Sequence, residues 1–342
     1  MAQHEAKMER QRLQWHRCLR AWCGAVVLAV WILSIGVALA GDQGRHYRVA
    51  VLTPGLSFLP VLEGLQEGLE KLGYVPGKNV ILVVEDTHGA VSDLVQRAAQ
   101  LAAAKPDVLV TVGTPHTRAA SQATTSVPIV FTRVGDPLQY RMIASYASSQ
   151  NNLTGISTYS GPLTGKRLEL LQEIVPGVKR ILAVVAQNEA NAQAAFERLA
   201  AVALKLGIQV LRHDVTTCEE IEQVLHTTPP GSVEAIYHVP SFLVSAHIDL
   251  LIQKARQEQL PLIVHEDSMV DQGALVSYGG HSRLMGVQAA KLVAKILEGT
   301  HPAQLPIQTP DKFIMTINLA TAKAIDLTLS RHILERADRL VE

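Results

Sequence analysis

The chain has 342 residues, and its 31 Lys and Arg residues balance its 31 Asp and Glu residues. The first 40 residues hold five basic and two acidic side chains, which leaves 26 basic against 29 acidic residues and a net charge of −3 in the rest. This excludes the basic stripe that nucleic-acid binding requires, so we expect no nucleic-acid partner. The roughly 300 residues that follow exceed what one hydrophobic core usually holds and indicate two domains.

The N-terminal segment has the pattern of an export signal. Residues 1–20 are basic, residues 21–40 are apolar and uncharged, and the run ends in Ala38-Leu39-Ala40. These are the three parts of a secretory signal peptide. A run of about 20 residues also suffices to span a bilayer. We therefore predict an exported protein, periplasmic or extracytoplasmic. Residues 1–40 are either a signal peptide, the favoured interpretation, or an anchor that tethers the chain to the inner membrane.

The cysteines add little to this assignment. Cys18 and Cys23 lie in the N-terminal segment, and Cys23 lacks the preceding small residues of a lipoprotein signal. Cys218 is the one cysteine beyond residue 40, so no internal disulfide is expected.

From Tyr47 onward, short β-branched runs alternate with amphipathic stretches. The expected strands are Arg48–Thr53, Val80–Val84, Val108–Val112, Ile129–Thr132, Ile181–Val185, Ile208–Leu211, Ala235–Val239, Leu262–Val264 and Leu275–Tyr278. The expected helices include Pro60–Leu72, Ser92–Ala104, Gly165–Ile174, Asn191–Leu206, Val244–Glu258 and Arg283–Leu297. Val- and Ile-rich strands that alternate with helices predict an α/β fold with doubly wound parallel sheets.

The alternation pauses once, at Asn151–Pro162, which is rich in Asn, Gly, Ser and Thr. We place the boundary between two lobes there. Residues 46–158 are then the N-terminal lobe and residues 159–280 the C-terminal lobe. The helix at 281–300 is expected to pack back on the first lobe.

Chemistry in such a fold is expected in the loops that follow the strands, because ligands bind at the carboxyl ends of parallel strands. These loops are small, hydroxylated or glycine-rich, and they precede helices whose N-termini attract anions. Each of Ser57, Thr114, Ser241 and Ser268, taken alone, is more simply a helix N-cap. Their convergence on one edge of both sheets favours a binding cleft.

Motifs typical of enzymes are missing from the sequence. It contains no Gly-x-Gly-x-x-Gly after Thr53, no phosphate-binding Walker loop and no Gly-x-Ser-x-Gly elbow. Asp136, Glu266 and Asp267 suggest an acid/base pair only weakly, since no nucleophile or metal motif accompanies them. We expect a binding protein without catalytic activity and without a cofactor.

Several stretches resemble one known family. They are Thr111–Pro115, Val127–Phe131 with Gly135–Pro137, Asn152–Ser157, Gly165–Pro176, Gly273–Gly279 and Phe313–Asp338. In this order they resemble the ABC transporter substrate-binding proteins of the type 1 periplasmic-binding fold, which include tryptophan/tyrosine-type binders. The resemblance runs from Tyr47 to the end of the chain.

The resemblance implies two Rossmann-like lobes with parallel sheets, joined by a three-strand hinge that closes on ligand. Residues 312–317 would form a last strand in the second lobe, and residues 318–342 a C-terminal helical tail. The implied ligand is a small polar molecule, such as an amino acid, and the implied partner is an ABC transporter permease. The alternative is a membrane-anchored ligand sensor of the same fold, which contacts the membrane through residues 21–40.

The resemblance also indicates ligand-binding positions. They are Ser57, Thr114, Pro115, Asp136, Asn188, Ser241, Glu266, Asp267 and Tyr278. Hydroxyl and N–H groups of the first lobe would hold a carboxylate, Glu266 or Asp267 an amine, and Tyr278 the side chain of the ligand.

Histidines depart from the family pattern. His116, His238 and His265 stand where small or apolar residues are usual, and His281 follows nearby. Imidazoles bind transition metals, but no His-x-x-x-His or cysteine pair accompanies them. We therefore predict no metal site and interpret these histidines as hydrogen-bond donors to a ligand carboxylate or as ordinary surface residues.

Overall fold

The computed structural model describes residues 46–55, 58–88 and 93–342. The predicted signal or anchor at 1–40 and the predicted site residue Ser57 lie outside these residues. Within the described residues, no helix is both long and apolar enough to cross a membrane.

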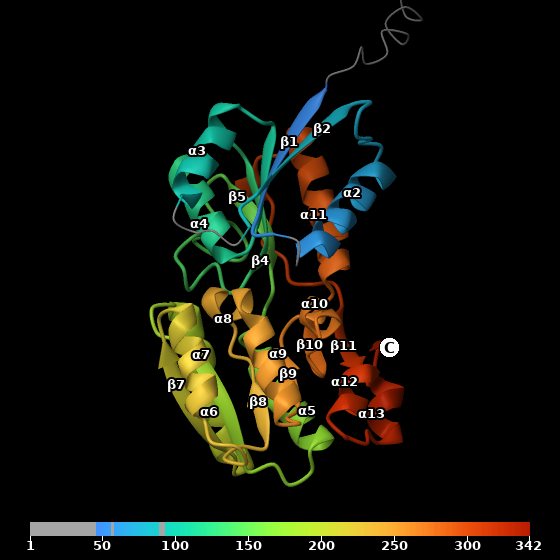
Figure 1. Ribbon diagram of the computed structural model, residues 1–342. Helices are drawn as coiled ribbons and strands as arrows, with labels where there is room; N and C mark the ends of the chain where they lie inside the picture. Colours follow the sequence, from blue (N-terminus) through green and yellow to red (C-terminus); the bar gives the residue numbers. More distant parts are fainter. Residues whose placement is uncertain (1–45, 56–57, 89–92) are drawn as a thin grey trace, which may run out of the picture. The chain divides into compact units, whose positions relative to one another are not determined.

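The first lobe is built on a five-stranded sheet with the order β2-β1-β3-β4-β5, in which every pair is parallel. Its strands are β1 (Tyr47–Thr53), β2 (Val80–Asp86), β3 (Val108–Val112), β4 (Ile129–Val134) and β5 (Leu153–Ser157). Its helices are α2 (Leu59–Lys71), α3 (Leu94–Ala103), α4 (Thr114–Ala123) and α11 (Ser282–Leu297). Helices α2 and α11 cover one face and α3 and α4 the other (Figure 1), so the central strands are buried on both sides.

The second lobe has a seven-stranded sheet with the order β12-β11-β10-β9-β8-β6-β7. Its strands are β6 (Arg180–Ala186), β7 (Gln209–Val215), β8 (Ala235–Tyr237), β9 (Leu262–Val264), β10 (Val276–Gly280), β11 (Phe313–Asn318) and β12 (Arg339–Val341). Only the β10–β11 pair is antiparallel.

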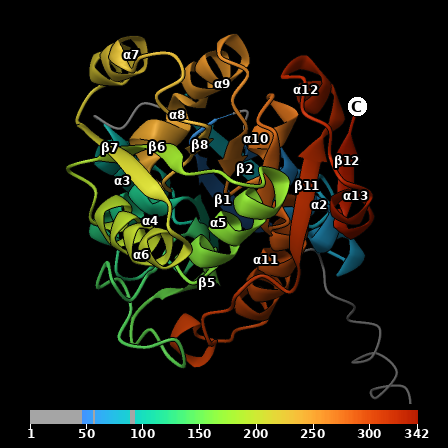
Figure 2. The same cartoon turned by 90° about the horizontal axis from the view of Figure 1, so that it is seen from below.

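Helices also cover both faces of this second sheet. They are α5 (Leu163–Ile174), α6 (Ala190–Leu206), α7 (Cys218–Thr227), α8 (Phe242–Ala246), α9 (Ile248–Gln257), α10 (Asp267–Asp271), α12 (Leu319–Ala324) and α13 (Arg331–Arg336). Viewed from below, α5 and α6 lie on one side of the strands and α7 and α9 on the other (Figure 2).

The chain crosses between the lobes three times. It passes from β5 to α5, from β10 to α11, and from residue Gln308, which bridges Ile156 in the first lobe, to β11. The predicted fold, two parallel α/β lobes joined by a three-strand hinge, is therefore confirmed.

Three local features differ from the sequence-based expectations. The segment 151–162, read as a pause, contains strand β5. The expected helix Val244–Glu258 is two helices, because His247 leaves the helical conformation at φ −117° and ψ 35°. The tail expected to be helical ends in β12, which pairs with β11.

Helices α2 and α11 approach so closely that glycine is required on both. A Cβ atom on Gly64 would lie 1.9 Å from the carbonyl oxygen of Arg283, and one on Gly286 would lie 2.0 Å from that of Val61. This contact fixes α11 to the first lobe after the second crossover.

We expect Gly64→Ala to lower the free energy of unfolding by about 2–3 kcal/mol, because the added methyl meets backbone that cannot yield. Gly165→Ala in α5 is the matched control. Its Cβ would lie 3.3 Å from a methyl group of the partly exposed Val202, which has to shift by only a few tenths of an ångström, so we expect a much smaller change. Urea unfolding of both variants measures the difference, and equal stability would contradict the packing argument.

Candidate functional site

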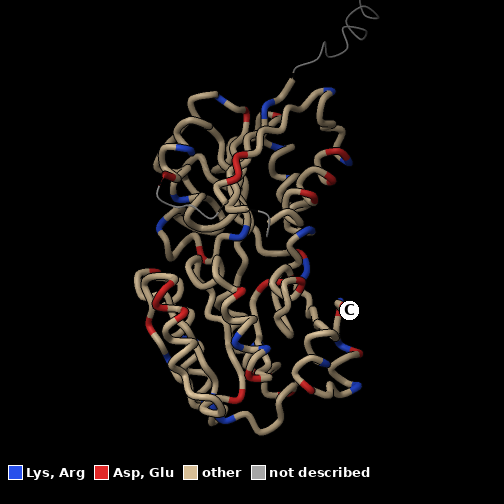
Figure 3. Tube along the Cα trace, in the orientation of Figure 1, with Lys and Arg blue, Asp and Glu red and all other residues tan. Residues whose placement is uncertain are grey.

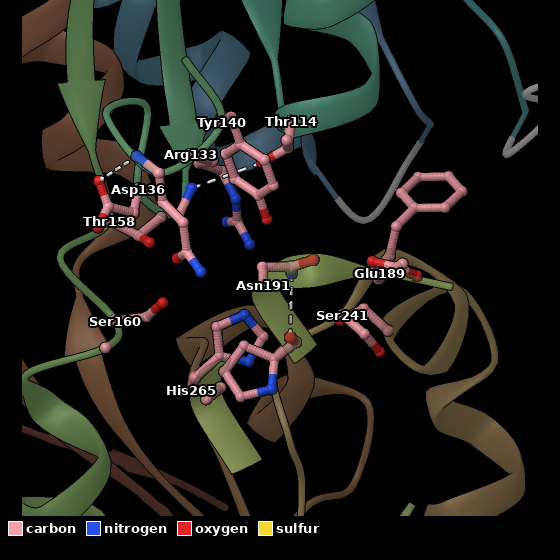
Figure 4. A pocket seen from close by; sticks show the side chains of 18 of the residues that line it. Thr114, Arg133, Asp136, Tyr140, Thr158, Ser160, Glu189, Asn191, Ser241 and His265 are labelled. Atoms are coloured by element: carbon pink, nitrogen blue, oxygen red, sulfur yellow. Dashed lines mark hydrogen bonds between the residues drawn. The ribbon is translucent and has the colours of Figure 1, made fainter. Parts of the chain in front are cut away.

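A cavity of about 620 Å³ lies between the lobes and is bordered by loops at the carboxyl ends of β1, β3, β4, β6, β8 and β9. Figure 4 shows Thr114, Asp136 and Tyr140 of the first lobe facing Asn191, Ser241 and His265 of the second. This is the position that parallel α/β sheets give to ligand sites.

The structure brings together six of the nine predicted positions. Those that line the cavity are Thr114, Pro115, Asp136, Asn188, Ser241 and Glu266. Asp267 and Tyr278 are absent from the lining formed by the described residues. Whether the six contact a ligand stays a prediction.

The first-lobe wall has a positive end at the start of α4. Gly113 precedes the helix with φ 88°, and Thr114 and Pro115 are its first two residues. Backbone N–H groups at a helix N-terminus lack intrahelical partners and attract anions. Arg118 lies one turn further along the same helix face, with its guanidinium carbon 5.6 Å from the centre of the Tyr140 ring. These groups together suit a carboxylate.

The same wall has a negative group in Asp136. Its Oδ1 accepts hydrogen bonds from the backbone N–H groups of Leu138 (3.1 Å) and Gln139 (3.2 Å) and from the Tyr146 hydroxyl (3.4 Å). Within the described part of the chain, its Oδ2 accepts none. Asp136 is therefore oriented by its own turn with one oxygen left for another donor.

Two polar residues on the second-lobe wall accept hydrogen bonds from the backbone of helix α8. The Ser241 hydroxyl accepts from the N–H of Val244, so the N-cap interpretation is confirmed for this residue. Both carboxylate oxygens of Glu189 accept from α8, from the N–H of Phe242 (2.7 Å) and of Leu243 (2.8 Å). The Glu189 carboxylate lines the cavity but is already satisfied by backbone.

Asp267 lies at the junction between the lobes. It is 5% exposed and accepts a hydrogen bond from the Ser282 hydroxyl (2.5 Å) and another from the Ser282 backbone N–H (3.3 Å). Ser282 begins α11, so Asp267 caps a helix that belongs to the first lobe. The sequence led us to expect Asp267 in the ligand site, but its carboxylate holds the start of α11 and does not border the cavity.

Tyr278 also departs from its predicted place. It lies on β10, where its side chain packs against the hydrophobic core of the second lobe and its carbonyl accepts a hydrogen bond from Arg167 Nε at 2.8 Å. Alternation along the strand turns this side chain to the core face.

Arg133 is a cavity residue that the sequence did not reveal. It occupies a β-bulge in β4, where the pairing with β5 shifts between Thr132 and Val134, and its φ is 60°. A bulge breaks the two-residue alternation of a strand and redirects a side chain. Here it places a guanidinium, 3% exposed, against Glu266 of the second lobe. Burial lowers the pKa of Arg133 to about 10, so it stays charged at neutral pH.

The Arg133 guanidinium has further partners. Its Nη1 donates to the Ser282 hydroxyl at 2.8 Å, and its central carbon lies 4.7 Å from the centre of the Phe58 ring. The Arg133 side chain thus contacts Ser282 and Phe58 in the first lobe and Glu266 in the second.

The four histidines have different surroundings. His116 is buried in the first lobe with Nε2 3.0 Å from the Thr87 hydroxyl, and burial lowers its pKa to about 4. His238 and His265 stack in the second lobe, and only His265 lines the cavity. His281 lies 3.4 Å from Asp267. Among the described residues, no three His, Cys, Asp or Glu side chains are grouped to hold a metal ion.

Charges of both signs are interspersed along both lobes (Figure 3). Of the charged residues that line the cavity, Arg118, Arg133 and Arg198 are basic and Asp136, Glu189 and Glu266 acidic. The cavity therefore has both kinds of charge and suits a small ligand that carries both.

Two lobes, three crossovers and, between the lobes, a cavity lined by both charged and aromatic side chains are the architecture of a solute-binding protein. The sequence model of the family described as ABC transporter substrate binding protein matches residues 48–341. The chain therefore belongs to this family, as the sequence resemblance indicated.

Individual relatives agree with this assignment. The chain is 26% identical over 265 residues to a tyrosine-binding protein of Clostridioides difficile, covering 78% of this chain and 76% of that one. It is 31% identical to a conserved domain protein of Vibrio cholerae O1 biovar El Tor, whose crystal structure matches 86% of this chain and 99% of that one with a TM-score of 0.79. A Streptococcus ABC domain crystallised with L-Trp is 23% identical, matching 86% of this chain and all of that one with a TM-score of 0.78, and supports the fold.

Proposed function

We propose that the chain acts outside the cytoplasm, where it binds an aromatic amino acid in the cavity and delivers it to an ABC importer. Family membership already shows that the chain is a substrate-binding protein. What we propose in addition is the class of its ligand. The observation that supports it is a cavity of about 620 Å³ bordered by the N-terminus of α4 and by Asp136, whose Oδ2 accepts no hydrogen bond within the described residues.

The polar groups assign the two ends of the ligand. The α4 N-terminus, with Thr114 and Arg118, would hold the α-carboxylate. Asp136 would accept from the α-ammonium through Oδ2. This replaces Glu266 and Asp267 in the amine-binding role, because Glu266 is paired with Arg133 and Asp267 with Ser282.

The side chain of the ligand would lie among aromatic rings. Phe58, Tyr159 and Phe242 line the cavity from both lobes and from the first crossover. Offset or edge-on ring pairs contribute about 0.5–1.5 kcal/mol beyond area burial. The names of two relatives, a tyrosine-binding protein and a structure with L-Trp, support the same class.

Binding alone suffices for this role, so we propose no catalytic activity. The ligand contacts both lobes and shifts the open and closed forms by its differential affinity for them. We also propose export, with residues 1–40 removed or kept as a tether. N-terminal sequencing of the protein from cells distinguishes the two.

Calorimetric titration of the purified protein tests the ligand. We expect L-tyrosine or L-tryptophan to bind and L-leucine and L-arginine to bind much more weakly. Asp136→Asn should weaken binding about 10- to 100-fold, because a hydrogen bond to a charged group contributes about 1.5–3 kcal/mol. Asp271→Asn is the control, since Asp271 pairs with Arg339 on the surface. No binding of either aromatic amino acid, or an unchanged affinity in Asp136→Asn, would rule out this assignment.

A further inference from the structure

One face of helix α6 borders the cavity with a polar, a small and a basic residue. Asn191, Ala195 and Arg198 all line it, and their spacing of four and three residues places them in one row along the helix. The Asn191 side chain donates a hydrogen bond to the carbonyl of Pro240 (3.1 Å), which fixes it at the start of the row. The row therefore has a small residue in its middle and a cation at its far end.

The guanidinium of Arg198 lies against the first crossover, where Gly161 makes room for it. A Cβ atom on Gly161 would lie 2.4 Å from Nη1 and 3.1 Å from Cζ of Arg198. Any side chain at residue 161 would therefore displace the guanidinium. The φ of Gly161 lies outside the left-handed region, so the backbone conformation does not itself require glycine. Glycine at this position is explained by the close approach of Arg198.

Arg198 differs from the other basic residues that line the cavity because it has no partner. Arg133 contacts Glu266, and Arg118 lies over the ring of Tyr140. Within the described part of the chain, Arg198 has neither a hydrogen bond nor an ion pair. A guanidinium offers only donors, so the group that suits it is an oxygen acceptor. A ligand oxygen that reaches Arg198 gains a charge-assisted hydrogen bond.

Asp136 and Arg198 are close enough for one small molecule to touch both. The Thr158 N–H donates to the carbonyl of Val134 (2.8 Å), and Figure 4 shows Thr158 near Asp136. Gly161, beside the guanidinium of Arg198, follows Thr158 by three residues. Three residues of chain span at most about 11 Å. A ligand that pairs with Asp136 through its ammonium group can therefore reach Arg198 with the far end of its side chain.

We propose that Arg198 determines which aromatic amino acid binds, by donating a hydrogen bond to a hydroxyl oxygen on the ring of the ligand. This inference rests on the proposed function and deepens it, because it selects L-tyrosine within the class. In this arrangement the ring lies over Ala195 and beside Tyr159, and its oxygen accepts from Arg198. L-Phenylalanine has no oxygen at that place, and the indole N–H of L-tryptophan can only donate.

Calorimetric titration of the full protein with L-tyrosine, L-phenylalanine and 4-amino-L-phenylalanine tests this. The third compound matches L-tyrosine in size, but its ring amino group mainly donates. We expect L-tyrosine to bind about 10-fold more tightly than either, the lower end of what a hydrogen bond to a charged group contributes, because Arg198 is exposed to solvent. Equal affinities for L-tyrosine and L-phenylalanine would overturn the inference and leave the aromatic class intact. If none of the three binds, the proposed function fails as well.

Variants assign the preference to Arg198. Arg198→Met should remove most of the preference for L-tyrosine and leave the affinity for L-phenylalanine unchanged. Gly161→Ala, whose methyl group displaces the guanidinium, should reduce the preference in the same way. Lys205→Met, at an exposed position seven residues further along α6, is the matched control and should behave as the wild type. A wild-type preference in Arg198→Met, or an equal loss of affinity for both amino acids, would contradict the proposal.

Discussion

Replacing Arg167 with alanine is expected to lower the free energy of unfolding by about 3–5 kcal/mol. Arg167 is 1% exposed and is among the largest fully buried side chains of the described residues. Its Nε donates to the carbonyl of Tyr278 at 2.8 Å and its Nη1 to that of Ser160 at 3.2 Å. The two carbonyls lie next to two different crossovers, so one side chain joins two hinge segments. Alanine leaves a cavity, removes the side-chain donor of the Tyr278 carbonyl, and leaves the Ser160 carbonyl with the long hydrogen bond from the Thr164 hydroxyl (3.5 Å).

Methionine separates these two causes. Arg167→Met fills most of the volume and removes a charge whose pKa is lowered by burial, which indicates that the site penalises the charge. It still removes the hydrogen bonds that Arg167 donates to the carbonyls of Tyr278 and Ser160. We expect Arg167→Met to recover part of the loss of the alanine variant. If it recovers the whole loss, the hydrogen bonds to the hinge contribute nothing.

A neighbouring residue provides the control. Lys166 precedes Arg167 on α5, but its side chain is 45% exposed and lies 3.5 Å from Glu169 on the surface. Lys166→Ala should change the stability by about 0.5 kcal/mol or less. Chemical unfolding of all the variants under the same condition gives the comparison. If Lys166→Ala lowered the free energy of unfolding as much as Arg167→Ala, the effect would be due to substitution in helix α5 in general and not to the contacts of Arg167.

The sequence was most informative where a pattern repeats. Strands buried on both faces read as continuous Val and Ile runs, so β1, β3 and β6 were predicted nearly to their ends. The carboxyl ends of parallel strands share one edge, so the loops with Thr114, Asp136 and Ser241 were correctly expected to meet. The periodicity of the sequence thus predicts where each loop falls along the chain, and the parallel topology of the sheets predicts which loops lie close together.

Side-chain direction was predicted less well, because it depends on local irregularity. The bulge that turns Arg133 toward Glu266 has no signal in the alternation of β4. Asp267 and Glu266 are adjacent in sequence, but one caps α11 while the other lines the cavity. In the sequence, Arg167 is a charged residue near the start of a helix, a position where side chains are usually exposed to solvent. Its burial is apparent only from the tertiary structure.

Replacing Arg133 with methionine is expected to weaken ligand binding about 10- to 100-fold, or about 1.4–2.8 kcal/mol. Methionine keeps an apolar contact with Phe58 but removes the contact with Glu266 and the hydrogen bond to Ser282. Glu266, 15% exposed, would keep a charge without its partner, and the closed form bears that cost because opening admits water. The affinity should fall through faster release of ligand, as is usual when a buried charge pair is broken.

A double-mutant cycle assigns this loss to the pair itself. If the contact with Glu266 causes the effect, Arg133→Met and Glu266→Gln together should cost much less than the sum of the two single changes. Arg97→Met is the matched control, because Arg97 forms its ion pairs with Glu85 and Asp93 inside the first lobe. It should leave affinity and lobe distance unchanged. Additive losses in the cycle would show that Arg133 acts within the first lobe, through Ser282 or Phe58, and not through its contact with Glu266 of the second lobe.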